Sequence, residues 1–335
     1  MDTIPRITNH SFIYVKETDR DNSITPLVSF TTYRAFLLIN SFGLTSIVAI
    51  FGVFSNTLNI IVFLRMGLRE TTNVGFFALA VVDWLVSVCS FLSVAARLPE
   101  ITFIGESTIS LTYYLVGVMF PCLGLGAWVT AVLSVERCIC IVIPLKVKTI
   151  VTRRRTLCLI SGMAVYEVVL GGLILTTVHT PYSQPNPARI ALLLYFYSIS
   201  VFTCFSLVLI SSIFIIIRLK KALQWRASCS TSTRTSGGGV ERKVVLSVLW
   251  ICIMFIACFT PMVVMFVAAF IHPRFVLLDP YYGWLVHVIF TFSYLFQTVS
   301  SALNILVYYN MSTKFRVILN GLLAYTCEQN EQQKS

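Results

Sequence analysis

Charged residues are scarce in this chain. Only 12% of its 335 residues are Asp, Glu, Lys or Arg, whereas 57% are hydrophobic. A soluble domain of this length needs more charge to cover its surface, so the composition argues against a water-soluble fold and predicts that the solvent is lipid. The net charge of +11 would suit a protein that binds nucleic acid. The basic residues, however, stand in short segments between apolar runs, which indicates membrane orientation and no nucleic-acid partner.

Long apolar runs take the place of the missing charge. A membrane-spanning helix needs about 20 mostly apolar residues, and only helices satisfy the backbone of such runs inside lipid. Seven stretches meet this length: 36–64, 71–96, 107–135, 156–188, 190–217, 244–271 and 280–313. The sequence therefore predicts an all-α fold, a seven-transmembrane helix bundle.

The basic residues lie mainly on one side of the predicted membrane. With the N-terminus outside, the inner segments hold 18 Lys or Arg against 5 Asp or Glu, and the outer segments hold 7 of each. This asymmetry follows the positive-inside rule. We expect a multi-pass protein of the plasma membrane, with an extracellular tail at 1–35, a seven-span domain at 36–313 and a cytoplasmic end at 314–335.

Cysteine is missing from every predicted outer segment, since all ten cysteines stand in spans or inner segments. An extracellular disulfide is therefore not expected. Asn9 begins an outer Asn-His-Ser sequon and is a predicted glycosylation site. Cys327, near the inner end of the chain, is a predicted palmitoylation site, with an unmodified thiol as the alternative.

A short amphipathic helix is predicted after the seventh span. Its apolar residues follow helical spacing, so the helix should lie in the plane of the membrane interface. They are Phe315, Ile318, Leu319, Leu322 and Leu323.

Two acidic residues interrupt the spans, Asp83 in the second and Glu167 in the fourth. Charge is costly in a bilayer, so each predicts a functional site. Asp83, Ser300 and Asn304 offer carboxylate, hydroxyl and amide groups that suit a sodium ion or a proton. Structural hydrogen bonding is the alternative, and no other cofactor is expected. For Glu167 the sequence predicts no specific role.

Three residues suit a moving inner face. Arg137 ends the third span and Glu241 opens the sixth at the same predicted level, so an ion pair between them would hold that face shut. Pro261 is expected to kink the sixth span and to turn a small outer displacement into a larger inner one. A plain membrane anchor and a static kink are the respective alternatives.

Several short motifs occur in a fixed order on these spans. They are Asn56, Leu79-Ala80-x-x-Asp83, Glu136-Arg137-Cys138 followed by Pro144, Cys258-Phe259-Thr260-Pro261 and Asn304-Ile305-Leu306-Val307-Tyr308. Together they resemble the rhodopsin-like (class A) G-protein-coupled receptors over essentially the whole chain. Two segments, 136–148 and 304–316, are similar in wording to molluscan-type chemosensory receptors.

The resemblance implies a receptor that binds an extracellular small molecule or peptide and activates a heterotrimeric G protein as span six moves outward. The implied switch residues are Glu136, Arg137, Glu241, Pro261, Asn304 and Tyr308. The implied G-protein contacts are Pro144 and Leu145. The implied ligand pocket comprises Met119, Phe120, Leu123, Phe259, Met262, Val263, Phe266, Tyr294 and Gln297. Membrane lipid, arrestin and a receptor kinase are further implied partners.

The chain also departs from the family pattern. Ile305 replaces the proline of span seven, and Phe259 replaces the tryptophan of span six. Met119 stands where amine receptors carry an aspartate, and Thr298 where opsins carry the retinal lysine, so neither a biogenic amine nor a retinal Schiff base is expected. Pro121 predicts a break in span three.

Other functional classes find less support. A small-solute transporter should show inverted repeats and paired broken helices, and neither is found. No HExxH or GxSxG motif occurs, and Asp83 has no evident carboxylate partner, so the protein is not expected to be an enzyme. The transporter and a non-signalling membrane scaffold stay as alternatives to the receptor.

Overall fold

The computed structural model describes residues 25–102, 106–178, 187–228, 237–276 and 279–332, and every regular element within these ranges is a helix. The structure does not describe the side chains of 97–116, 148, 174, 177–194, 222–223, 225–242, 311 and 325–335. The long elements are α1 (Phe30–Leu37) with η1 (Leu38–Thr45) and α2 (Ser46–Met66), α3 (Thr71–Thr102), α4 (Glu106–Val142), α6 (Arg153–Val178), α7 (Pro187–Ser228), α8 (Gly237–Ile271) and α9 (Gly283–Met311). The others are η2 (Pro144–Lys146), α5 (Val147–Ile150) and α10 (Thr313–Gln332).

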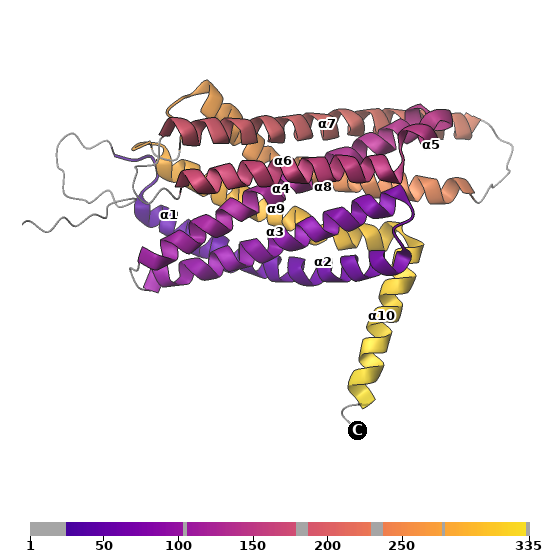
Figure 1. Cartoon of the computed structure of the whole chain (residues 1–335), viewed down its shortest axis with the longest axis horizontal. Helices are drawn as coiled ribbons and strands as arrows, with labels where there is room; N and C mark the ends of the chain where they lie inside the picture. Colours follow the sequence, from indigo (N-terminus) through magenta and orange to yellow (C-terminus); the bar gives the residue numbers. More distant parts are fainter. Residues whose placement is uncertain (1–24, 103–105, 179–186, 229–236, 277–278, 333–335) are drawn as a thin grey trace, which may run out of the picture.

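The long helices run side by side as one bundle, and α10 leaves one end of it across the bundle axis (Figure 1). Within the described ranges, seven helices are long and apolar enough to cross a membrane. The predicted all-α, seven-span architecture is therefore confirmed. We call the end that carries α5 and α10 the predicted inner end.

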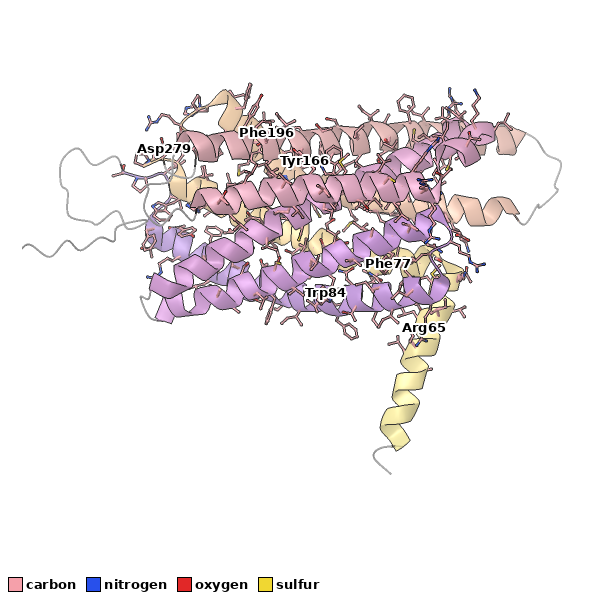
Figure 2. All side chains as sticks on the ribbon, viewed as in Figure 1. Arg65, Phe77, Trp84, Tyr166, Phe196 and Asp279 are labelled. Carbon is pink, nitrogen blue, oxygen red and sulfur yellow. The ribbon has the colours of Figure 1, made fainter. Side chains whose placement is uncertain are left out.

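The surface of the bundle is apolar where lipid would surround it. Ile47 and Val168 are both 67% exposed, and Phe196 is 46% exposed. Figure 2 shows Phe196, Tyr166 and Trp84 on the outside of the long helices. Such a surface is unfavourable in water but matches the hydrocarbon of a bilayer.

Several helix ends differ from the predicted spans, the first and fourth spans among them. The first helix begins at Phe30, not at 36, because Ser29 caps it: its Oγ accepts from the Thr32 backbone N–H at 3.1 Å. The fourth span was predicted to reach 188, but residues 187 and 188 belong to the next helix, α7, and 179–186 lie outside the described residues. Hydropathy marks the lipid-embedded part of a helix, whereas local capping decides where the helix starts.

The first span contains a wide helical turn. Residues Leu38–Thr45 form the π-helical segment η1 between α1 and α2. Two hydroxyls donate to backbone oxygens five residues earlier, Thr45 Oγ1 to Asn40 at 2.8 Å and Ser46 Oγ to Ser41 at 3.3 Å. Backbone bonds in a π-helix also span five residues, so these side chains reinforce the local register.

The predicted break at Pro121 was wrong, because α4 continues through it from Glu106 to Val142. The proline ring lies against α6 where Gly171 has no side chain: a Cβ on that glycine would lie 2.2 Å from Pro121 Cγ. One lost backbone hydrogen bond is tolerated inside a long helix that a neighbouring helix supports.

An aromatic cluster closes the predicted inner end. The Tyr308 ring lies 5.0 Å from the rings of Phe63 and Phe76 and 5.6 Å from that of Phe315. Because these rings come from α9, α2, α3 and α10, the cluster joins four helices. Phe315 is fully buried at the start of α10.

The apolar stripe of α10 packs on the bundle along its first turns. Leu319 is buried, Ile318 and Leu322 are half-buried, and Leu323 is 45% exposed. Basic side chains cap the neighbouring helix ends: Lys314 Nζ donates to the Met66 oxygen at 3.2 Å. Arg316 Nε donates to the oxygen of Tyr309 at 3.1 Å, so α10 is tied to both α2 and α9.

At the opposite end of the bundle, ring stacking and hydrogen bonds join the helices. No disulfide links the cysteines of the described ranges. Tyr33 of α1 stacks on Trp284 of α9 at 4.9 Å. Asp279 Oδ1 accepts from the backbone N–H groups of Tyr282 at 2.9 Å and Tyr281 at 2.8 Å, and Oδ2 pairs with Arg274 at 3.1 Å. These bonds, the one from Tyr282 foremost, hold the pKa of Asp279 below its ordinary value.

Replacing Phe315 by Ala should lower the thermal unfolding midpoint of the purified protein in detergent. The change empties a fully buried site, and a buried Phe→Ala change costs about 3–5 kcal/mol. Val317→Ala is the matched control, because Val317 lies on the same helix and is 67% exposed. Equal midpoints for the two variants would contradict the packing of α10 on the bundle.

Candidate ligand and signalling sites

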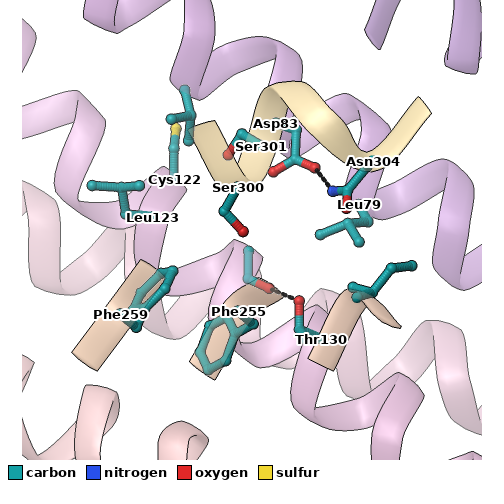
Figure 3. Close-up of a pocket in the computed structure, with 13 residues that line it drawn as sticks. Leu79, Asp83, Cys122, Leu123, Thr130, Phe255, Phe259, Ser300, Ser301 and Asn304 are labelled. Atoms are coloured by element: carbon teal, nitrogen blue, oxygen red, sulfur yellow. Dashed lines mark hydrogen bonds between the residues drawn. The ribbon is translucent and has the colours of Figure 1, made fainter. Parts of the chain in front are cut away.

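A cavity with polar and apolar walls lies inside the bundle between α3, α4, α8 and α9 (Figure 3). Asp83 is 5% exposed, and its Oδ2 accepts a hydrogen bond from Asn304 Nδ2 at 2.7 Å. Ser301 lines the cavity beside the same carboxyl group. Ser300 and Thr130 add hydroxyls to the lining, while Phe255 and Phe259 form an apolar wall.

The cavity brings together the three residues predicted to hold sodium, Asp83, Ser300 and Asn304. The polar atoms of its lining are mainly oxygens, which hard cations prefer as ligands. Within the described residues, no group of three or more His, Cys, Asp or Glu could hold a metal. The donor set thus fits a monovalent cation or water better than a transition metal.

The predicted ligand residues on α4, α8 and α9 meet in part. The Phe120 ring lies 5.0 Å from that of Tyr197 and 6.0 Å from that of Tyr294. The Tyr197 ring lies 6.2 Å from that of Phe266. We call these four residues the aromatic cluster; it joins α4, α7, α8 and α9. Tyr197 was missed, although a hydroxyl inside the apolar run of span five was a usable signal.

The remaining pocket residues contact other neighbours. Met119 and Leu123 pack against α3, with Tyr294 beside them. Met262 is fully buried between α8 and α9, against Met265 and Val286. Phe259 stacks on Phe255 at 4.2 Å and lines the cavity. Val263 packs against the main core. The predicted residues therefore face the bundle interior but do not form a single contact surface.

Gln297 is a buried amide in this region. It is 1% exposed, and neither its Nε2 nor its Oε1 has a hydrogen-bond partner among the described residues. On α9 it lies one turn from Tyr294 and one turn from Ser301, on the same helix face. Leaving such a group unpaired is costly, so Gln297 is suited to bind a molecule that enters from the end opposite the predicted inner end.

At the predicted inner end, Glu136 contacts a residue that was not foreseen. Its Oε1 accepts a hydrogen bond from Thr156 of α6, and its Oε2 lies 4.0 Å from Arg137 Nη2. The side chain of Glu241 lies outside the described residues, so its pairing with Arg137 stays a prediction. Helix α8 begins at Gly237, four residues before Glu241.

The predicted G-protein contacts lie on a short structured turn. Pro144 opens η2, and Leu145 is 97% exposed. Arg155 Nη1 donates to the oxygen of Thr149 at 2.6 Å and of Ile150 at 3.2 Å, which fixes α5 beside this turn. Leu145 thus presents an apolar side chain on a supported backbone.

The other predicted sites are placed as follows. Pro261 lies inside a continuous α8, and its kinking effect stays a prediction. Tyr308 is buried among the rings of Phe63, Phe76 and Phe315 at the predicted inner end. Asn9 lies outside the described residues, and Cys327 lies in α10 with its side chain outside them.

Comparison with known proteins covers most of this architecture. The family model described as 7 transmembrane receptor (rhodopsin family) matches residues 55–308. A search of curated proteins found no match. The matched range includes the Asp83 cavity, Arg137 and Tyr308. With seven helices able to span a bilayer, this multi-pass membrane protein belongs to the rhodopsin family of seven-transmembrane receptors.

Proposed function

We propose that the protein is a G-protein-coupled receptor of the plasma membrane that binds an uncharged small molecule or short peptide from outside the cell. The N-terminus is extracellular in this proposal, because the basic residues gather in segments at the opposite side. The observation that carries the proposal is the unpartnered amide of Gln297 beside the aromatic cluster. This arrangement joins apolar contact area with one polar anchor, as ligand sites do.

The chemistry of the pocket sets the class of ligand. None of its nine predicted residues carries a charge, and Met119 offers only a soft apolar side chain. Gln297 both donates and accepts, and the buried Tyr197 hydroxyl also has no described partner. A ligand with an aromatic or aliphatic body and an amide-like group satisfies both features, because an amide pairs with an amide in both directions.

The ligand would act on the stacked pair Phe255–Phe259, which lines the cavity. Displacing this stack moves α8, and Pro261 provides the point at which α8 bends. The predicted inner end then opens, and a G protein contacts Leu145 and the neighbouring Lys and Arg side chains. The ligand shifts the equilibrium only as far as it binds the open state more tightly than the closed state.

A sodium ion is proposed as a stabiliser of the closed state, held by Asp83, Ser300 and Asn304. The purified protein should then unfold at a higher temperature in sodium chloride than in potassium chloride of equal strength, since a bound ion stabilises the folded state. Asp83→Asn should remove the difference. Equal midpoints of the unsubstituted protein in the two salts would contradict sodium binding.

Cells that express the receptor should respond to neutral, amide-containing compounds in a screen that reads G-protein activation. Gln297→Leu should weaken the potency of any active compound about tenfold to hundredfold, because a buried hydrogen bond is lost. Val264→Ile, a change at an exposed position of α8, should leave potency unchanged. If purified receptor promotes nucleotide exchange on no class of heterotrimer, the receptor proposal fails and a scaffold or transporter is favoured.

Glu241→Gln should raise basal nucleotide exchange. The change removes the negative partner proposed for Arg137, and an ion pair that contributes up to about 1 kcal/mol supports an increase of up to about fivefold. Glu70→Gln removes an exposed acid on the inner side and should have no effect. Unchanged basal exchange at equal surface expression would count against the latch.

A further inference from the structure

A second carboxyl group lies inside the bundle where α4, α6 and α7 meet. Glu167 of α6 is 1% exposed. Trp128 Nε1 of α4 donates to Glu167 Oε1 at 3.1 Å and to Ser200 Oγ of α7 at 2.9 Å. The Ser200 hydroxyl donates to the same Glu167 oxygen at 3.0 Å. Three side chains from three helices therefore form a closed triangle of hydrogen bonds.

The backbone of α4 leaves room for this carboxyl group. A Cβ on Gly124 would lie 2.4–2.6 Å from three atoms of the Glu167 carboxyl, so any larger residue there would displace the carboxyl group. One turn along α6, Gly171 receives the ring of Pro121 in the same way. Small residues let helices approach closely in membranes. The Glu167 side chain thus packs directly against the α4 backbone at the interface between α4 and α6.

Among the described residues, no positively charged side chain interacts with Glu167. The titratable side chains that interact with it electrostatically are Tyr166, Tyr197 and Cys204. Its hydrogen-bond donors, an indole and a hydroxyl, are neutral. Its Oε2 has no partner among the described residues. A carboxylate in this position would be an unpaired charge in the membrane interior, which is strongly unfavourable.

The triangle lies next to the aromatic cluster. Ser200 follows Tyr197 by three residues on α7, so both lie on one helix face. Trp128 follows Phe120 by eight residues, which is about two turns of α4. The hydrogen bonds therefore join α7 to α4 just inward of the 5.0 Å contact between Phe120 and Tyr197.

We propose that Glu167 is an uncharged positioning residue, which holds α7 against α4 and α6 through Ser200 and Trp128 and so sets the geometry of the aromatic cluster. The role in ligand geometry rests on the proposed receptor function. The uncharged state and the coupling between the three helices do not.

The uncharged state is tested by infrared spectroscopy of the full-length protein in lipid nanodiscs. The wild-type spectrum should contain the C=O stretch of a protonated carboxylic acid that is missing from E167Q. This band should persist over the pH range in which exposed carboxyl groups are ionised. V168L, a change at a lipid-exposed neighbour on α6, should keep it. If the wild-type and E167Q spectra differ instead at the frequencies of an ionised carboxylate, the proposal is overturned.

The coupling is tested by thermal unfolding of the same samples. E167Q keeps the accepting oxygen and the shape of the side chain, so its midpoint should match the wild type. E167L removes the acceptor and should lower the midpoint by several degrees, since the Trp128 and Ser200 donors lose a buried partner. S200A combined with E167L should cost less than the sum of the single changes, because the residues act as one unit.

Two outcomes would overturn the coupling: an E167Q midpoint as low as that of E167L, or strictly additive effects of E167L and S200A. Neither measurement requires signalling. If wild-type protein shows the infrared band and the coupling but promotes no nucleotide exchange, only the receptor proposal fails. If exchange occurs without the band, only the Glu167 proposal fails.

Discussion

A polar side chain in the membrane interior is stabilised by a partner within the protein, because lipid offers none. Asp83 and Asn304 are such partners across α3 and α9, at 2.7 Å. Asn56 Nδ2 likewise donates to the Ser301 backbone oxygen at 3.0 Å, across α2 and α9. These bonds decide which helix faces meet, since apolar side chains alone would pack equally well against lipid. The cavity and the aromatic cluster both depend on the resulting rotation of each helix.

The seven spans could be predicted because hydropathy is a local property of each segment. The helix ends could not, since they depend on capping: the Ser29 cap starts α1 in a stretch whose Thr and Arg residues lower the hydropathy. The break expected at Pro121 failed for a different reason. The effect of its ring depends on Gly171, which is fifty residues away in sequence and adjacent in space.

The candidate sites divide in the same way. Asp83 and Asn304 stand out in the sequence as polar groups within apolar runs, and the structure brings them together. Tyr197 and Thr156 gain their roles only from the rotation of α7 and α6, which no single segment encodes. The surroundings of Glu167 likewise come from three helices, although the acid itself was visible in the sequence. Sequence patterns thus locate a buried polar group more readily than its partner.

The π-helical segment η1 has a consequence for comparing this chain with its relatives. A wide turn takes up extra residues without ending the helix, so the residues of α1 are offset in rotation and rise from those of an uninterrupted α-helix. Counting outward from Asn56 therefore assigns α1 positions to the wrong equivalents in a receptor that lacks the wide turn. An alignment of the first span with such a receptor places its gap at Leu38–Thr45.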